Sequence, residues 1–575
     1  MCSIVQAKEE KRRRARGVNT SLIIKFSSTE TLFRRERRLS MKSKKFFERI
    51  GCLFQRNNEC HMAQLQRRMP LTTLHIIPCL SVYTIQTPFT MYPENVIPGK
   101  DSVDSGLRKE LPSAKRHPLV NQMVAETVSK TSPRRQIKTS TNIKDTSERK
   151  GWNCPVSEHA KNTVNPIRKI VDQLQVSPNP YKKPIKLHLG DPTLTGTLPP
   201  CETAVVAIKE AVESHAYDGY GPAVGTLEAR EAIAKQFTLP EAPITADDVI
   251  LASGCSHALQ LAIEALANAG DNILCPLPGF PLYSTLCRPH GIEDRFYRLD
   301  MDRGAEIDLS HLESLIDNRT KAIIVNNPGN PTGAVFSKAH LEDIVTIAYN
   351  HKIPIIADEI YGDLTYGGAT FHPIASLSPK VPVISCDGIG KRYLVPGWRL
   401  GWVVCYDRYG ALAEVKKGMV ALSQKIVGPC ALVQGALPKI LKETPQSFFE
   451  NIKAVLARNA EIVYEALSKI PGIKPIRPQG AMYMMVGFDT KNYGDETAFV
   501  QGLISEESVY CLPGGAFGLS GWFRLVLTYS DEVTLDACNR LTEYCARHYR
   551  KSTVVPIHED SDNSEGDSAL STESD

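Results

Sequence analysis

The sequence predicts an α/β fold in which a mostly parallel sheet is covered by helices on both faces. From about residue 162 onward, short apolar runs alternate with segments of helical periodicity, and the apolar runs are continuous. Buried parallel strands have this pattern, because both faces of such a sheet contact helices. Short strands and helices mixed together after Gly472 predict a second, smaller domain.

Six apolar runs bounded by polar or turn residues are predicted as strands of the large sheet. In chain order they are Asp248–Ser253, Asn272–Pro276, Lys321–Asn326, Pro354–Asp358, Val381–Cys386 and Arg399–Cys405. Amphipathic segments predict helices, among them His257–Asn268, Lys338–Asn350 and the long Phe448–Ile470. Open α/β sheets bind ligands at the carboxyl ends of their strands, so we expect the functional residues there.

The amino-acid composition limits the classes of protein to which this chain can belong. The 575 residues are 42% hydrophobic and 23% charged, which is typical of a soluble globular protein, and no apolar run is long enough to span a membrane. The 15 cysteines are odd in number and form no CxxC pair, so we expect buried reduced thiols, for instance Cys275, Cys386 and Cys405. We therefore expect a cytoplasmic protein, with a mitochondrial location as the alternative.

The two ends of the chain differ from its body in charge. Residues 1–70 carry 18 Lys+Arg against 6 Asp+Glu, whereas residues 557–575 carry seven acids and no Lys or Arg. The body is near neutral, which argues against nucleic acid as its ligand. We predict five parts: a basic, disordered extension over 1–150, an arm with part of the small domain over 151–200, the large domain over 201–445, the small domain over 446–552, and an acidic, disordered tail over 553–575.

The most informative motif is a lysine in a glycine-rich turn. Lys391 follows an apolar run and lies among small residues, and Arg399 comes eight positions later. An amine that backbone can approach closely suits condensation with the aldehyde of pyridoxal phosphate, and a fixed cation suits the phosphate of that cofactor. Such a turn is otherwise typical of an exposed loop, so the interpretation depends on the rest of the chain.

Three further segments follow predicted strands. Ser253–His257 joins a strand to a helix whose first amides suit a phosphate, and His257 itself is expected to be a surface residue of the first turn. Asn326–Gly333 by itself indicates only a turn. Asp358 ends an apolar strand, where a carboxylate needs a partner: a cationic pyridine nitrogen would serve, and so would a helix cap or an ion pair.

Taken in order, these segments resemble the class I aminotransferases, which are fold-type I enzymes that use pyridoxal phosphate. The order runs through the loop 253–257, Phe280, Asn330, Asp358 with Tyr361, Lys391 with Arg399, and finally Arg524. The resemblance covers about 400 residues, from Trp152 to Tyr549, and leaves out the first 150. It implies a large domain with a mostly parallel seven-stranded sheet and a smaller α/β domain.

The resemblance also implies a role for each residue. Lys391 binds the cofactor covalently and acts as the base, and Asp358 pairs with the ring nitrogen. The other implied cofactor contacts are Tyr361 and Asn330 at the ring oxygen, Phe280 stacked on the ring, and Gly254, Cys255, Ser256 and Arg399 at the phosphate. Many relatives have a phosphate-binding serine three residues before the lysine, where this chain has Gly388, so one phosphate contact stays open.

The implied active unit is a homodimer, in which Tyr220 reaches the phosphate of the neighbouring subunit. Arg524 binds the substrate α-carboxylate, with the backbone of Gly190 beside it. The closer phrases, such as Asn165–Arg168 and Gly190–Thr193, imply L-tyrosine as amino donor and 2-oxoglutarate as acceptor. Neither a metal nor a membrane partner is implied.

Two alternatives remain. A carbon–sulfur β-lyase or a decarboxylase on the same fold would use the same lysine and aspartate. The basic N-terminal segment also suggests a regulator that joins this fold to a DNA-binding module, but the segment shows no helix-turn-helix pattern.

Overall fold

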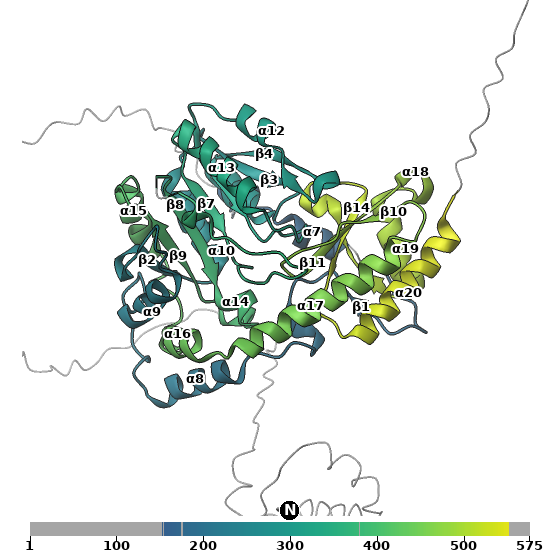
Figure 1. The fold of residues 1–575 in the computed structure, drawn as a ribbon, viewed down its shortest axis with the longest axis horizontal. Helices are drawn as coiled ribbons and strands as arrows, with labels where there is room; N and C mark the ends of the chain where they lie inside the picture. The colour runs from purple at the N-terminus through teal and green to yellow at the C-terminus, as the bar shows by residue number, and fades with distance from the viewer. Residues whose placement is uncertain (1–151, 153, 174–175, 379, 551–575) are drawn as a thin grey trace, which may run out of the picture. The chain divides into compact units, whose positions relative to one another are not determined.

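The structure is a computed structural model that describes residues 152, 154–173, 176–378 and 380–550 (Figure 1). The predicted extension over 1–150 and the predicted tail over 553–575 lie outside the described residues. No helix within the described ranges has both the length and the apolar character needed to cross a bilayer.

A large mixed sheet lies at the centre of the fold and confirms the predicted α/β class. Its strands follow the order β2-β9-β8-β7-β6-β3-β4-β5. Six of the eight run in one direction, whereas β9 and β5 run against their neighbours. The strands are β2 Val249–Ala252, β3 Asn272–Leu277, β4 Glu293–Asp300, β5 Glu306–Ile307, β6 Thr320–Asn326, β7 Ile355–Asp358, β8 Val383–Gly388 and β9 Gly401–Tyr406.

All six predicted strands are present, with ends that differ by a few residues. The sheet has one strand more than the seven expected, because the two-residue β5 extends its edge. Strand β4 has no continuous apolar run, since much of its surface is only partly buried, and the sequence pattern therefore missed it. Strand β9 begins at the end of the sheet where β8 stops, so it has to run antiparallel to β8.

Helices cover both faces of the large sheet, as predicted. Successive strand residues point to opposite faces, so Leu251 and Ile323 join one core while Ile250 and Ile324 join the other. The first core is closed by α8 Glu202–Glu213, α9 Leu227–Phe237, α13 Lys338–His351 and α16 Ala431–Glu443. The second is closed by α10 Cys255–Leu266, α11 Leu282–Cys287 and α15 Ala413–Ser423.

A four-stranded antiparallel sheet forms a second layer with its own core. It consists of β10 Ile473–Pro475, β11 Tyr483–Phe488, β14 Trp522–Val526 and β13 Leu512–Pro513. The long helix α17 Gln446–Leu467 packs against α20 Asp531–His548 beside it (Figure 1). A short ladder of β1 Ile185–Lys186 with β12 Val509–Tyr510 brings the segment after β1 next to β14, where the Val526 amide donates to the Leu187 carbonyl at 3.0 Å.

The cysteine prediction is confirmed for most of the described residues, although Cys154 and Cys430 are exposed. Cys275, Cys386 and Cys405 are buried free thiols in the strands of the large sheet. Burial raises the pKa of the Cys405 thiol to about 12, so it stays protonated near neutral pH.

Candidate active site

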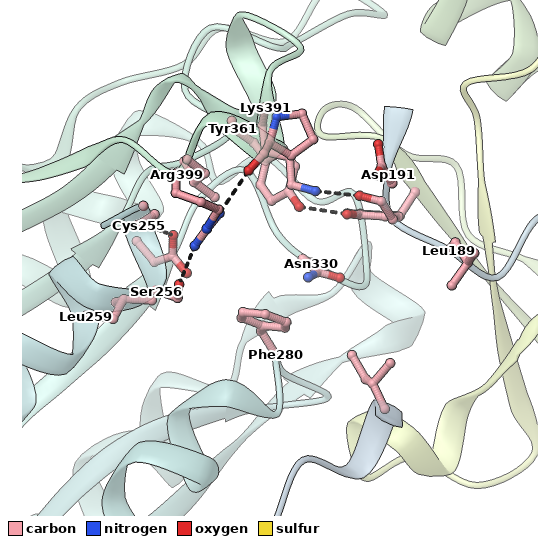
Figure 2. Close-up of a pocket in the computed structure, with 18 of the residues that line it drawn as sticks. Leu189, Asp191, Cys255, Ser256, Leu259, Phe280, Asn330, Tyr361, Lys391 and Arg399 are labelled. Carbon is pink, nitrogen blue, oxygen red and sulfur yellow. Dashed lines mark hydrogen bonds between the residues drawn. The ribbon is translucent and has the colours of Figure 1, made fainter. Parts of the chain in front are cut away.

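A cavity of about 470 Å³ lies at the carboxyl ends of the parallel strands of the large sheet (Figure 2). Eleven of the twelve predicted site residues line it, so the fold brings together segments that are far apart in the sequence. They are Gly190, Gly254, Cys255, Ser256, Phe280, Asn330, Asp358, Tyr361, Lys391, Arg399 and Arg524. The exception is Tyr220, which is fully exposed and does not line the cavity of its own chain.

Lys391 lies on the single-turn helix α14 Ile389–Arg392, directly after β8. Its Nζ donates to the Gly190 carbonyl at 2.5 Å, which aims the amine into the cavity (Figure 2). A Cβ at Gly190 would lie 2.6 Å from the Tyr483 hydroxyl, so a larger residue would displace this contact. The amine is thus held at the meeting point of the two sheets.

The surroundings of Gly388 explain why this chain has no serine three residues before Lys391. Its backbone is extended, with φ 173°. A Cβ there would lie 2.7 Å from the Leu400 carbonyl and 2.9 Å from the Cα of Gly401. The loop after Lys391 therefore packs too closely on β8 to leave space for a side chain at this position.

Asp358 lies at the end of β7 and is almost completely buried, at 2% exposure. Its Oδ2 accepts a hydrogen bond from the Tyr283 hydroxyl at 2.7 Å, and its Oδ1 accepts one from the Cys255 thiol at 3.7 Å. Burial raises the pKa of Asp358, and these donors partly offset that effect. No cationic side chain of the described residues pairs with this carboxylate, so a cation supplied by a ligand would complete the site.

Arg399 brings a positive charge to the cavity, in contrast to the negative Asp358, and it lies at the N-terminus of α10. Its Nη2 donates to the Ser256 hydroxyl at 3.0 Å (Figure 2). The same Nη2 donates to the Ser253 carbonyl at 3.1 Å. A Cβ at Gly254, whose φ is +80°, would lie 2.4 Å from the same guanidinium. Within the described part of the chain Arg399 pairs with no carboxylate, and the first amides of α10 have no partner inside the helix, so the site suits a phosphate.

Arg524 lies on β14 and is 3% exposed. Its Nη1 donates to the Asn330 side-chain oxygen at 2.8 Å, and its Nη2 donates to the His188 carbonyl at 3.1 Å. Its Nε is buried and has no hydrogen-bond partner. A buried guanidinium with an unused donor and no acid beside it is suited to bind a carboxylate.

Two phenols lie between the lysine and the arginine. The hydroxyls of Tyr361 and Tyr483 are 2.7 Å apart and share a hydrogen bond. Burial raises the pKa of Tyr361 well above its usual value. Burial also opposes ionisation of Tyr483, but the positive charges of Lys391 and Arg524 outweigh it and lower the pKa of that phenol. Tyr483 is therefore the more acidic of the two.

Several lining residues were missed by the sequence analysis. Tyr483, His188 and Asp191 reach the cavity, as do Ile167, Arg168 and Val171 of α7 Pro166–Gln173. Tyr283, which holds Asp358, occupies a position that the sequence shows only as one more apolar residue of a helix. His257 was expected at the surface of the first turn of α10; it is partly buried, and its Nδ1 accepts a hydrogen bond from the Ser253 amide at 3.1 Å. No cluster of metal-ligating side chains is found in the described ranges.

Residues 182–541 match the family model described as aminotransferase class I and II. The chain belongs to this family. It is 59% identical to the tyrosine aminotransferase of Caenorhabditis elegans over 415 residues, which cover 72% of this chain and 88% of that one. It is 48% identical to the tyrosine aminotransferase of Homo sapiens over 402 residues, covering 69% of this chain and 88% of the relative.

A solved structure gives the same result for the fold. The tyrosine aminotransferase from Leishmania infantum superposes with a TM-score of 0.67 at 33% identity, covering 70% of this chain and all of the other. Class I and II aminotransferases use pyridoxal phosphate, as the sequence predicted. The cavity fits that cofactor, because it offers an amine, a buried carboxylate without a cation, and an arginine without an acid.

Proposed function

We propose that the protein transfers the amino group of L-tyrosine to 2-oxoglutarate, giving 4-hydroxyphenylpyruvate and L-glutamate, the first step of tyrosine catabolism. The aminotransferase activity follows from the family, and the donor is supported by the tyrosine aminotransferases at 59% and 48% identity. The observation that carries the proposal is the buried Arg524, which has no acid beside it and lines the same cavity as Lys391 and Asp358.

Each residue has a distinct part in this reaction. Arg524 and the backbone at Gly190 bind the α-carboxylate, which fixes the orientation of the substrate and hence the bond that breaks. Lys391 would hold the cofactor covalently, and its amine would move the α-proton of the substrate as a general base. Pyridoxal phosphate supplies the electron-withdrawing ring that accepts the charge left when the proton departs.

The remaining contacts hold the cofactor in place. Asp358 would keep a proton on the ring nitrogen, since its buried carboxylate needs a cation. Tyr361 and Asn330 would bind the ring oxygen, and Phe280 would pack on the ring. Arg399 with Gly254, Cys255 and Ser256 would hold the phosphate.

The proposal includes a homodimer located in the cytoplasm. The exposure of Tyr220 supports the homodimer, because its phenol is accessible to a second subunit. We propose the domain boundaries given above, with the large domain over 201–445 and the small domain over 446–552.

A panel of amino donors with 2-oxoglutarate as acceptor tests the function. L-tyrosine is expected to react fastest and L-phenylalanine more slowly, because a pocket that hydrogen-bonds the phenol disfavours the analogue that lacks it. The rate should follow ping-pong kinetics. Better turnover of alanine, or release of pyruvate and thiol from a cysteine conjugate without any oxo acid, would replace the proposal with a sister aminotransferase or a β-lyase.

A further inference from the structure

We propose that a buried ion pair between Asp387 and Arg392 positions the reactive amine of Lys391. Neither residue lines the cavity, and neither was among the predicted site residues. The pair holds the short helix that carries the lysine in a fixed place relative to the turn that follows β7. The inference depends on Lys391 being the reactive amine, but not on which amino donor the enzyme prefers.

The helix that carries Lys391 is too short to be stable without support. α14 has four residues, barely one turn, and such a helix is stable only when other parts of the fold hold it. Gly388, which precedes it, supplies no side-chain cap. Leu394, shortly after it, has a φ of +58°, which residues other than glycine rarely adopt. Contacts from outside the helix therefore have to fix the direction of the lysine side chain.

Asp387 and Arg392 supply such contacts at the two ends of α14. Asp387 Oδ1 accepts a hydrogen bond from the Gly388 amide at 2.6 Å, and its Oδ2 accepts one from Arg392 Nη2 at 3.3 Å. Both residues are buried, with exposures of 4% and 6%. Since one residue precedes Lys391 and the other follows it, the pair closes the turn around the lysine and limits its rotation.

Arg392 also contacts the turn that follows β7. Its Nη1 lies 3.7 Å from an Oδ2 of Asp363. A Cβ at Gly362 would lie 2.6 Å from Arg392 Nη2, so the glycine leaves space for the guanidinium. Tyr361 directly precedes that glycine, and its ring centre lies 5.9 Å from Lys391 Nζ (Figure 2). One guanidinium therefore joins the turn of the amine to the turn of a residue proposed to contact the cofactor.

The pair is poorly explained as a contact that stabilises the fold. Burying two charges costs free energy, and their attraction recovers it only when the remaining polar atoms are also bonded. Arg392 Nε is buried and has no hydrogen-bond partner among the described residues. Burial raises the pKa of Asp387 to about 6, and the charge of Arg392 opposes that shift, so the carboxylate is mostly ionised near neutral pH. Apolar side chains would stabilise the fold equally well, so the pair contributes a fixed geometry.

The test changes the pair in two ways that separate positioning from stability. Arg392→Lys keeps the charge but lacks the planar group that contacts Asp387 and Asp363 together. The double variant Asp387→Leu/Arg392→Met replaces both charges by apolar side chains. Arg295→Gln is the control, because Arg295 pairs with Asp317 at 2.8 Å and neither residue lines the cavity.

Three quantities are measured on the full-length holoenzyme. The thermal unfolding midpoint reports stability. The visible circular dichroism of the bound cofactor reports how the lysine holds the ring, independently of turnover. Steady-state rates with L-tyrosine and 2-oxoglutarate separate an effect on kcat from an effect on KM.

The apolar double variant is expected to unfold within about 5 °C of the wild type. Its kcat is expected to fall about 10- to 100-fold with a changed visible circular dichroism, because the amine is misplaced, while KM changes less than twofold. Arg392→Lys is expected to keep the unfolding midpoint and to lower kcat about fivefold. Arg295→Gln should lower the midpoint and leave kcat and the circular dichroism unchanged.

A wild-type kcat and circular dichroism in the apolar double variant would overturn the inference, because the pair would then serve packing alone. An equal loss of kcat in Arg295→Gln would also overturn it, since reduced stability would explain the effect. If the double variant does not fold, Arg392→Lys decides, and wild-type values of kcat and circular dichroism in that variant would overturn the inference. A different preferred amino donor would replace the proposed function but leave this inference intact, because the Lys391 amine serves every donor.

Discussion

The cavity has two halves that are built in different ways. The large-sheet half is lined by Asp358, Cys255 and Arg399, which lie in or just beyond strands of one sheet, and Tyr283 of α11 donates a hydrogen bond to Asp358 from outside the lining. The small-sheet half contains Arg524, His188 and Tyr483, which come from β14, the segment after β1, and β11.

The two halves differ in which of their polar groups lack a hydrogen-bond partner or an opposite charge. In the small-sheet half, Arg524 Nε and His188 Nδ1 are buried without a hydrogen-bond partner. In the large-sheet half, the carboxylate and the guanidinium both have neutral partners and lack only an opposite charge. The comparison indicates that the large-sheet half is preorganised for a charged group that stays bound. The small-sheet half instead keeps polar atoms without a hydrogen-bond partner for a ligand that enters and leaves.

Lys391 lies where the halves meet, so its loss should have the largest effect. Lys391→Ala is expected to lower turnover by several orders of magnitude, because both the covalent anchor and the base are removed. Arginine at this position should not restore activity, since it has no free amine. Near-normal single-turnover rates in Lys391→Ala would show that the amine is not the reactive group.

Asp358→Asn tests the large-sheet half alone. The shape is kept but the charge is lost, so the cofactor should still bind through Arg399 and Lys391 while removal of the α-proton slows about 10²- to 10³-fold. Single-turnover absorbance with α-deuterated L-tyrosine measures that step. A variant with a wild-type rate constant and isotope effect would remove Asp358 from the mechanism.

His188→Asn tests the small-sheet half through its pH dependence. The folded-state pKa of His188 is about 4, below its ordinary value of 6.5, so the unfolded chain binds this proton more tightly. Wild-type stability should therefore fall as the pH drops from 6.5 to 4, by about 3 kcal/mol at most from this group. Unfolding midpoints at pH 7, 5.5 and 4 should fall less steeply in the variant, and parallel curves would contradict the shift.

Tyr283→Phe should have the smallest effect, again confined to the large-sheet half. It removes one hydrogen bond to a buried carboxylate, which predicts about tenfold weaker cofactor binding and a shifted pH titration of the cofactor absorbance. Tyr297→Phe is the matched control, because its equally buried hydroxyl donates to the Ile324 carbonyl at 2.7 Å, away from the cavity. The same loss in both variants would mean that Tyr283 acts only through packing.

The sequence was enough to predict six of the eight strands of the large sheet and the candidate reactive residues of the large-sheet half. Apolar runs that end in Asp358 or lead into Lys391 are local features, and an α/β sheet places such ends at one edge. Gly254 and Gly388 are local features too, so they could also be recognised in the sequence. Only the structure shows that Gly254 leaves space for the Arg399 guanidinium and Gly388 for the Leu400 carbonyl.

The tertiary structure alone decided the direction of β9, the contact of Tyr283 with Asp358, and the entry of Tyr483, His188 and Arg168 into the cavity. The Arg524–His188 contact joins residues 336 positions apart, and the phenol pair spans 122 positions. Local pattern encodes which face of an element is apolar, but it does not encode which distant element that face meets. The residues that complete a site from a second sheet therefore look, in sequence, like ordinary core or surface residues.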